Sequence, residues 1–350
     1  MDVLLSLPLT APRHAVWPAG FHTVCDESDL SDRFERRFIR LGRGADWLAQ
    51  ASLAWTLLRK RSRFDVVVTG RYGEYFALLQ SLLPFGKRPH LLLDVEWLAV
   101  EGRPWRRALN RWLHRRMVAG ASRVQVFCDA EARNYARHFG VSESKFVCIP
   151  YSSDAEPVRL ASPLCSSGGF IFSCGDHQRD YRTLLAAVAG LPVEVRIAAR
   201  ESSLGSLELP ENVKLLGRVR EDEYWRVVAG CRFLVVSVRP GLLRYSGVRT
   251  YAEAMHAGKC IVVNDPFGAS SYVEHGKTGF LVQPEDPAAL RRQICELLAS
   301  PETVETVGAN ARKAALERFS GAAYVRTIGG IVSEVRPDGL TPRSVATREP

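Results

Sequence analysis

The feature that most constrains the fold is a regular alternation of apolar segments and one helix-forming segment between Arg232 and Asp286. Three apolar runs have the length of strands, at residues 233–238, 260–263 and 278–282. Their continuous hydrophobicity is typical of strands buried on both faces of a parallel sheet. Residues 250–258 begin with a Thr/Glu start signal and end at a glycine, which predicts a helix. The stretch therefore predicts a βαβ unit, and open sheets of this kind bind ligands at the carboxyl ends of their strands.

The same stretch resembles the donor-binding region of retaining glycosyltransferases of family 4, the glycosyl transferases group 1. The resemblance is carried by five segments in the family's order: the strand at 233–238, Ala252-Glu-Ala-Met-His-Ala-Gly258, Ile261-Val-Val263, Gly268, and HGKTGFLVQPED at 275–286. It covers about residues 60–320. It implies an α/β protein of the GT-B fold, with two Rossmann-like, doubly wound domains facing a central cleft.

Glu253 has two interpretations. In the first it closes a capping box, with Thr250 as the N-cap and Glu253 bonding back to the Thr250 amide. In the second, implied by the resemblance, its carboxylate accepts hydrogen bonds from the ribose hydroxyls of a nucleotide sugar. The flanking family segments favour the second interpretation.

The sequence departs from the family pattern eight positions before Glu253, where a first glutamate that contacts the donor sugar is replaced by Tyr245. The segment Tyr245-Ser246-Gly247-Val-Arg-Thr250 resembles a branch of the family that lacks this glutamate. Backbone amides and hydroxyls at the start of the following helix would then face the diphosphate. A second glycine turn joins this predicted donor site, at Gly268, Ala269 and Ser270.

Two further turns complete the predicted donor site. The family places two basic side chains on the diphosphate after the first strand of its second domain, where this chain has Gly175, Asp176 and Arg179. Arg179 is therefore our candidate for a diphosphate ligand, although a lone loop arginine is often only solvated. Arg218 and Val219 follow Gly217 at the turn where the family holds the nucleotide base through its backbone.

The amino-terminal half contains fewer segments that resemble the family pattern. The loop after the first predicted strand, Val3–Leu7, has no glycine pair. Residues 91–96 are predicted to form another strand, and family members often have a histidine at the end of the corresponding strand. This chain has Asp94 and Glu96 there. Two carboxylates two residues apart on a strand point to the same side, which makes them our catalytic candidates. The alternative is that they bond loop amides or arginines.

Charge is unevenly distributed along the chain. Residues 1–150 carry 23 Lys and Arg against 15 Asp and Glu, so this half supplies eight of the nine excess positive charges. Within it, Trp105–Arg116 predicts a basic amphipathic helix with a stripe of Trp105, Leu109, Trp112 and Leu113. Such a helix can lie on an anionic membrane surface. The alternative, slightly favoured by sequence alone, is a core-facing helix with solvated arginines. No nucleic-acid recognition motif accompanies the charge, so we expect no nucleic-acid partner.

The predicted organisation is an acceptor-side domain at 1–155, a linker at 156–169 and a donor domain at 170–320. A helix at 321–336 is predicted to cross back to the first domain, and a flexible tail to fill 337–350. The eight cysteines are scattered without metal-binding spacing, which predicts reduced thiols and no metal. We expect a cytoplasmic protein, or one bound peripherally to the cytoplasmic face of the membrane.

The resemblance implies a metal-independent, retaining hexosyltransferase of polysaccharide or glycoconjugate biosynthesis. Its donor would be a UDP-, GDP- or ADP-sugar, with no other cofactor, and its acceptor a glycan, a lipid-linked molecule or a small molecule. The alternative is a non-catalytic GT-B relative that binds a sugar nucleotide or a partner. Loss of the first glutamate, the glycine pair and the strand-end histidine favours that alternative.

Overall fold

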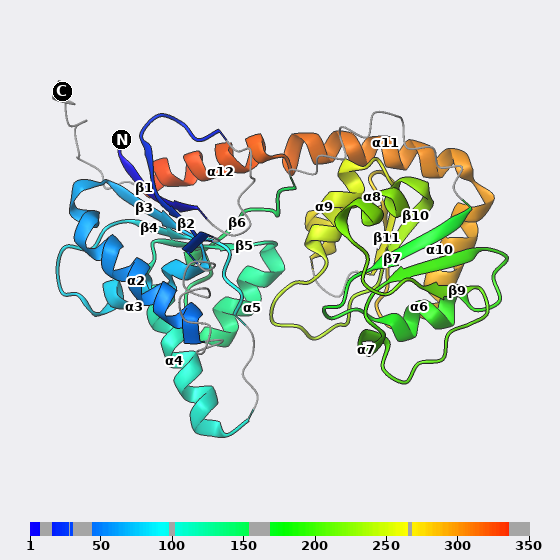
Figure 1. Cartoon of the computed structure of the whole chain (residues 1–350), viewed down its shortest axis with the longest axis horizontal. Helices are drawn as coiled ribbons and strands as arrows, with labels where there is room; N and C mark the ends of the chain where they lie inside the picture. The colour runs from blue at the N-terminus through cyan, green and yellow to red at the C-terminus, as the bar shows by residue number, and fades with distance from the viewer. Residues whose placement is uncertain are drawn as a thin grey trace. The chain divides into compact units, whose positions relative to one another are not determined.

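The computed structural model describes residues 1–7, 16–27, 29–30, 44–97, 102–153, 169–264 and 268–335. The described chain forms two compact units (Figure 1). Unit 1 comprises the described residues of Met1–Val126, Ala132–Ile149 and Val325–Pro350, and unit 2 those of Phe127–Glu131 and Pro150–Tyr324. The predicted linker, except Gly169, and the predicted tail lie outside the described residues.

Unit 1 is built on a six-stranded parallel sheet with strand order β2-β1-β3-β4-β5-β6. Its strands and helices, in chain order, are β1 (Val3–Leu7), β2 (Phe21–Asp26), α2 (Gly44–Lys60), β3 (Val66–Thr69), α3 (Glu74–Leu82), β4 (His90–Leu92), α4 (Pro104–Gly120), β5 (Arg123–Val126), α5 (Asp129–Phe139) and β6 (Phe146–Cys148). The first three residues of α5, Asp129–Glu131, are grouped with unit 2.

The continuous apolar strands of unit 1 are buried as their sequence predicts. Val66, Val67 and Val68 are fully buried in β3, because helices cover both faces of a parallel sheet. Helices α3 and α4 pack closely where Gly120 meets the Ala77 carbonyl, and a Cβ at position 120 would lie 1.8 Å from that oxygen. This close contact fixes the end of α4 against the unit.

Unit 2 contains a second six-stranded parallel sheet, with strand order β12-β11-β10-β7-β8-β9. Its strands and helices are β7 (Phe170–Cys174), α6 (Tyr181–Val188), β8 (Glu194–Ala198), α7 (Glu201–Leu204), β9 (Val213–Leu215), α8 (Glu221–Gly230), β10 (Cys231–Val236), α9 (Val248–His256), β11 (Ile261–Asn264), β12 (Phe280–Val282), α10 (Pro287–Ala299) and α11 (Pro301–Arg318). Helix α12 (Gly321–Glu334) follows, and from Val325 onward it is grouped with unit 1.

Helix α9 is the most enclosed helix among those described in unit 2, with eight of its nine residues buried. Tyr251 and Met255 belong to the apolar core that also contains strand residues Leu234, Val236 and Ile261. Helix α11 packs on α9 through a contact of two glycines, since a Cβ at Gly308 would lie 2.3 Å from the Gly258 carbonyl oxygen. The helix that begins after the Ser246–Gly247 turn is therefore held from several sides.

The α/β prediction of two Rossmann-like domains is confirmed, because both sheets are parallel and flanked by helices. The predicted βαβ unit of residues 232–286 corresponds to β10, α9, β11 and β12. Helix α9 begins two residues earlier than predicted, and β4 ends at Leu92 rather than at residue 96. Within the described ranges, no helix is both long and apolar enough to cross a bilayer.

We predict that Gly308→Ala destabilises unit 2 by about 1–3 kcal/mol, because an added methyl group would collide with the Gly258 backbone at a packed helix contact. Gly330→Ala is the matched control. Gly330 is also inside a helix, but it is exposed and a Cβ there would meet no atom within 4 Å. The control should be neutral or stabilising by about 0.5–1 kcal/mol. Equal effects in chemical denaturation would contradict the close α9–α11 contact.

Candidate donor-binding site

A cavity of about 340 Å³ opens at the carboxyl edge of the unit 2 sheet. It is bounded by the ends of β7 and β8, the turn after β9, and helices α8 and α9. Its lining residues are Cys174, Gly175, Asp176, Ala198, Ala199, Gly217, Arg218, Val219, Glu221, Tyr224, Trp225, Arg249, Thr250 and Glu253. This is the edge at which open α/β sheets bind their ligands.

Five of the twelve predicted donor-binding residues line this cavity: Gly175, Arg218, Val219, Thr250 and Glu253. The other seven are outside its lining, namely Arg179, Tyr245, Ser246, Gly247, Gly268, Ala269 and Ser270. The cavity brings together residues from two turns and from helix α9, which are far apart in the sequence. The roles of individual residues in binding a donor stay predictions.

The capping-box interpretation of Glu253 is wrong. Helix α9 begins at Val248, and its N-cap is Gly247 in the left-handed conformation, with φ 100°. Thr250 is consequently inside the helix, and Glu253 lies in its middle, beyond reach of an N-cap amide. The Thr/Glu signal predicted the wrong start of the helix, because the loop already ends at the Ser246–Gly247 turn, before Thr250.

The Glu253 carboxylate is instead held at the wall of the cavity by two side-chain donors. Tyr224 donates its hydroxyl hydrogen to Oε2 at 2.9 Å, and Arg249 donates from Nε to Oε1 at 2.7 Å. The residue is only 7% exposed. Each carboxylate oxygen can accept more than one hydrogen bond, so the two donors orient Glu253 and leave acceptor capacity for a ligand.

Tyr224 and Arg249 were not predicted from the sequence. Burial, followed by the nearby Cys174 and Glu253, raises the pKa of Tyr224 well above its ordinary value, so its hydroxyl stays a donor. The charge of Glu253, opposed by burial, raises the pKa of Arg249 above its ordinary range. The only available signal was the i, i+4 spacing of Arg249 and Glu253 on one helix.

Arg179 is buried next to the cavity and joins three segments of unit 2. Its guanidinium donates to the Cys174 carbonyl at 2.9 Å, the His177 carbonyl at 3.0 Å, the Ser246 hydroxyl at 3.3 Å and the Thr250 hydroxyl at 3.2 Å. Four of its five N–H donors are therefore used within the protein. The contact of Arg179 with a diphosphate stays a prediction. In this structure Arg179 holds the end of β7, the turn at His177 and the start of α9 together.

The hydrogen bonds of Arg179 require a glycine at position 175. Gly175 has φ 108°, a conformation that side-chain-bearing residues rarely adopt. A Cβ at this position would lie 2.6 Å from Nη2 of Arg179. The turn after β7 therefore needs glycine both for its backbone and for space beside Arg179.

Asp176, which stands where the family has an arginine, binds a different arginine. Its carboxylate accepts from the Arg200 amide at 2.7 Å, from Arg200 Nε at 3.0 Å and from the Ser203 hydroxyl at 2.7 Å. Burial raises the pKa of Asp176, but these hydrogen bonds and the Arg200 charge outweigh it and lower the pKa below its ordinary value. The contact with Arg200 was not predicted, because the two residues are 24 positions apart in the sequence.

The turn before α9 is organised by Tyr245 and Ser246. The Tyr245 side chain is 3% exposed and bonds its hydroxyl to that of Tyr251 at 2.9 Å. Its amide donates to Glu131 at 3.3 Å. Ser246 donates its hydroxyl hydrogen to the His177 carbonyl at 3.1 Å. A buried Tyr245 side chain gives no support to a donor contact through the ring.

The second glycine turn lies at the end of β11. Gly268 has φ 97° and precedes a short 3-10 helix, Ala269–Ser271. A Cβ at Gly268 would lie 2.6 Å from the Cys128 sulfur. Ala269 is fully buried, whereas Ser270 is exposed. The backbone of this turn is thus fixed by packing.

The prediction that Asp94 and Glu96 share one face of a strand is wrong. Strand β4 ends at Leu92, and Asp94 has φ 55°, which turns the chain out of the strand. Asp94 is 3% exposed, and its amide donates to Gln125 Oε1 at 2.8 Å. Glu96 is exposed and forms an ion pair with Arg71 at 3.2 Å. Their predicted catalytic role stays a prediction.

Two glutamates that the sequence did not single out lie at the same edge of unit 1. Glu27 accepts from the Ser6 hydroxyl at 2.9 Å, the Gly70 amide at 2.8 Å and the Tyr72 amide at 3.1 Å. Burial raises the pKa of Glu27 to about 8, although these hydrogen bonds oppose it. Burial also raises the pKa of Glu74 to about 7, against a hydrogen bond from Trp97 and the Arg71 charge.

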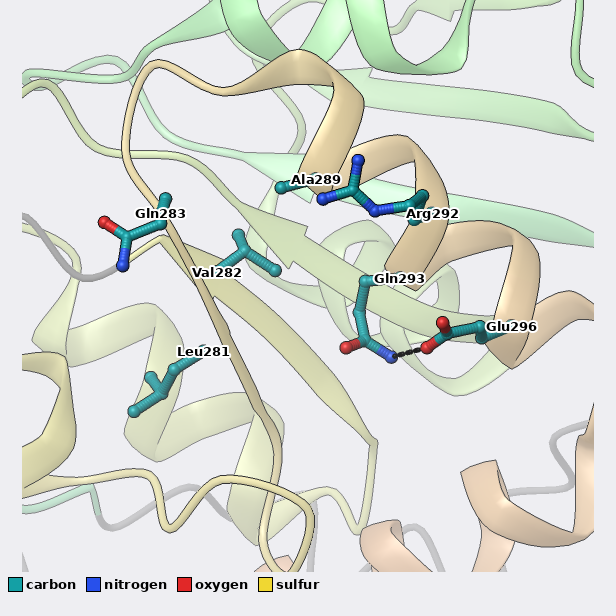
Figure 2. A pocket seen from close by; sticks show the side chains of 7 residues that line it. All are labelled: Leu281, Val282, Gln283, Ala289, Arg292, Gln293 and Glu296. Carbon is teal, nitrogen blue, oxygen red and sulfur yellow. Dashed lines mark hydrogen bonds between the residues drawn. The ribbon is translucent and has the colours of Figure 1, made fainter.

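A separate hollow lies between the end of β12 and the first turns of α10 (Figure 2). Arg292, Gln293 and Glu296 of α10 line it, and Gln293 donates to Glu296 at 3.2 Å. None of the predicted donor-binding residues lines this hollow. It is therefore a site distinct from the cavity beside Glu253.

Two family models match the chain. Residues 183–314 match the model described as glycosyl transferases group 1, and residues 9–152 match the glycosyl transferase 4-like domain. The chain is 30% identical over 135 residues to the D-rhamnosyltransferase WbpZ of Pseudomonas aeruginosa. It is 36% identical over 81 residues to the putative glycosyltransferase EpsD of Bacillus subtilis. These alignments cover 38% and 23% of this chain, but only 33% and 21% of the two relatives.

The solved structures extend the similarity of fold to 95% of the chain. HepE of Anabaena in complex with UDP aligns with a TM-score of 0.65 at 19% identity, over 95% of this chain and 100% of that chain. Sucrose-phosphate synthase of Thermosynechococcus elongatus aligns with a TM-score of 0.60 at 17% identity, over 95% and 88%. The fold is thus GT-B, and together with the two family models it supports a GT-B glycosyltransferase of the group 1, family 4-like type.

We predict that Arg179→Lys destabilises unit 2 by about 2 kcal/mol or more, because one ammonium cannot reach acceptors on three segments and leaves buried ones unpaired. Arg182→Lys, at an exposed position of α6, is the control and should change stability by less than about 0.5 kcal/mol. Both are measured by urea denaturation followed through tryptophan fluorescence. Equal stability of the two variants would contradict the positioning role of Arg179.

We also predict that the stability of unit 1 falls as pH rises from 4.5 to about 8. In this range the unfolded chain has released the Glu27 proton and the folded chain retains it, so each pH unit costs about 1.4 kcal/mol. Glu74 acts in the same direction up to about pH 7. Glu27→Gln should make the decline shallower, whatever its absolute stability.

The exposed Glu143 provides the control, since Glu143→Gln should leave the slope unchanged. The measurement is the denaturant midpoint of each protein at pH 5, 6, 7 and 8. Parallel slopes for the wild type and Glu27→Gln would mean that Glu27 is ionised throughout.

Proposed function

We propose that the protein transfers a sugar from a nucleoside diphosphate sugar to an acceptor hydroxyl, with retention of anomeric configuration. The observation that carries this proposal is the Glu253 carboxylate, buried and oriented at the wall of a cavity. Gly175, Arg218, Val219 and Thr250 of the predicted donor site line the same cavity. HepE was crystallised with UDP and with UDP-glucose, which makes UDP-sugars the first donors to test.

In this proposal the cavity receives the nucleoside and α9 receives the diphosphate. The backbone of Gly217–Val219 would hold the base, and Glu253 would accept hydrogen bonds from ribose hydroxyls. The N-terminus of α9 has no side-chain cap, so its first amides are available to an anion. The helix dipole and the neighbouring arginines would stabilise the departing diphosphate, and we propose that no metal ion is needed.

Unit 1 would supply the acceptor side. Asp94 and Glu96 stay our catalytic candidates, and the structure adds Glu74, whose pKa of about 7 suits a group that takes a proton near neutral pH. We propose a glycan or lipid-linked acceptor and a cytoplasmic location. Transfer breaks the bond between the donor sugar and the diphosphate and forms one to the acceptor oxygen, whose proton a carboxylate can accept.

One observation favours the second candidate function, a non-catalytic sugar-nucleotide-binding protein. The position of the family's first glutamate is occupied by Tyr245, and its side chain is buried in the core. Incubation with radiolabelled UDP-, GDP- and ADP-sugars separates the two functions. Transfer or slow hydrolysis of a donor supports the enzyme, whereas tight binding without turnover supports the non-catalytic protein.

We predict that Glu253→Gln weakens donor binding by about 1.5–3 kcal/mol, because an amide replaces a charged acceptor. Glu223→Gln is the control, as Glu223 is exposed on α8 and outside the cavity lining. Affinities for the nucleoside diphosphate and its sugar are measured by calorimetry, and folding by circular dichroism. Unchanged affinity in folded Glu253→Gln would remove the ribose contact from the proposal.

A further inference from the structure

The first half of α4 projects from unit 1. All residues from Gly102 to Leu109 are exposed, around the full circumference of the helix. The second half is anchored, because Met117 and Val118 are buried and the His114 ring stacks on Trp97 at 5.0 Å and meets Phe139 at 5.1 Å. The helix therefore has a packed end and a projecting end.

The projecting end presents an apolar stripe to the solvent. Trp105 is 56% exposed, and Leu109 and Trp112 are each 49% exposed. Their i, i+4, i+7 spacing places them on one side of the helix. The alternative of a core-facing helix, which the sequence alone slightly favoured, is therefore wrong for these three residues. Exposed tryptophans and leucines gathered on one stripe mark a surface that binds an apolar partner.

Positive charge surrounds this stripe. Residues 102–120 contain six arginines and no acidic residue: Arg103, Arg106, Arg107, Arg111, Arg115 and Arg116. Two guanidinium groups lie over the tryptophan rings, with Arg106 at 5.3 Å from the Trp105 ring centre and Arg116 at 6.0 Å from that of Trp112. Three of the arginines are at the N-terminal end, which has no side-chain cap and where the helix dipole disfavours cations. An anionic partner would relieve this repulsion.

We propose that the projecting end of α4, Arg103–Arg115, docks on an anionic membrane surface. Tryptophan rings sit at the level of lipid headgroups, leucine reaches the acyl boundary, and arginines pair with phosphate and acidic headgroups. The alternation of apolar stripe and flanking arginines fits this layered surface better than a nucleic acid, whose bases would need stacking platforms in a groove.

Docking through α4 would also specify the acceptor class of the proposed function, and this part of the inference rests on that function. Helix α4 follows β4, so its projecting end lies beyond the carboxyl edge of the unit 1 sheet, as Asp94 and Glu96 do. Docking would hold the acceptor-side loops at the headgroup layer. The acceptor class that fits is a hydroxyl-bearing molecule carried on a membrane lipid.

The test is co-sedimentation of the full chain with vesicles of phosphatidylcholine alone or mixed with phosphatidylglycerol. The wild type should sediment with anionic vesicles, much less with neutral ones, and less at high salt because exposed charges are screened. Replacing Arg106, Arg107, Arg111 and Arg115 with Gln should reduce the partition coefficient at least a hundredfold, at about fivefold per arginine.

A matched control removes four other exposed basic residues of unit 1, by Gln substitution of Arg59, Lys60, Arg63 and Lys87. Both quadruple variants lower the net charge from +9 to about +5. The control should keep most of the binding. Equal losses in the two variants, binding to neutral vesicles as tight as to anionic ones, or no binding by the wild type would overturn the proposal.

A second pair of variants tests the apolar stripe. Trp105→Ala with Leu109→Ala should weaken binding at least tenfold, since membrane affinity scales with buried apolar area. Trp47→Ala with Trp55→Ala, two exposed tryptophans of α2, should have little effect. If the double variant of α2 weakened vesicle binding as much as the double variant of α4, docking through α4 would be contradicted.

Nucleotide-sugar affinity is measured on the same variants. The α4 variants should bind donor like the wild type, because the donor cavity is built from unit 2 residues. Donor binding without α4-dependent sedimentation would overturn docking and leave the proposed function standing. Sedimentation that depends on α4 without any donor binding would support docking and refute the proposed function.

Discussion

Much of unit 2 depends on the hydrogen bonds of one buried guanidinium. Arg179 connects the end of β7, the turn at His177 and the start of α9, and its own carbonyl accepts a hydrogen bond from Arg239 at 3.1 Å. Arg179 is only 7% exposed, and burial of its charge is tolerated because nearly every N–H donor of the guanidinium is paired. The network contributes to the geometry of the cavity, since it joins Cys174 to Thr250 and both residues line the cavity.

The proposed donor cavity combines a rigid helix with an oriented carboxylate. Helix α9 is enclosed by the core and by α11, so Glu253 cannot shift without disturbing packed residues. Tyr224 and Arg249 fix both carboxylate oxygens before any ligand arrives. Preorganisation of this kind lowers the entropic cost of binding a flexible sugar nucleotide.

The sequence predicted the two parallel sheets and the βαβ unit around α9 well, because continuous apolar strands and glycine turns are local signals. It failed where contacts are distant in sequence, as for Tyr224 with Glu253 and for Asp176 with Arg200. It also failed for Thr250 and Asp94, where a left-handed residue moved the boundary of a helix or a strand. The buried Glu27 was unpredictable because its partners come from two other strand ends.

The most direct test of the donor site is hydrogen exchange of the full chain with UDP-, GDP- or ADP-sugars, with the free monosaccharide as control. We predict that one of these donors slows exchange in two places, the Gly217–Val219 turn and the first turn of α9. The monosaccharide should leave both unchanged. Protection confined to other segments, such as α10 beside the second hollow, or none with any donor, would contradict a nucleotide-sugar site in this cavity.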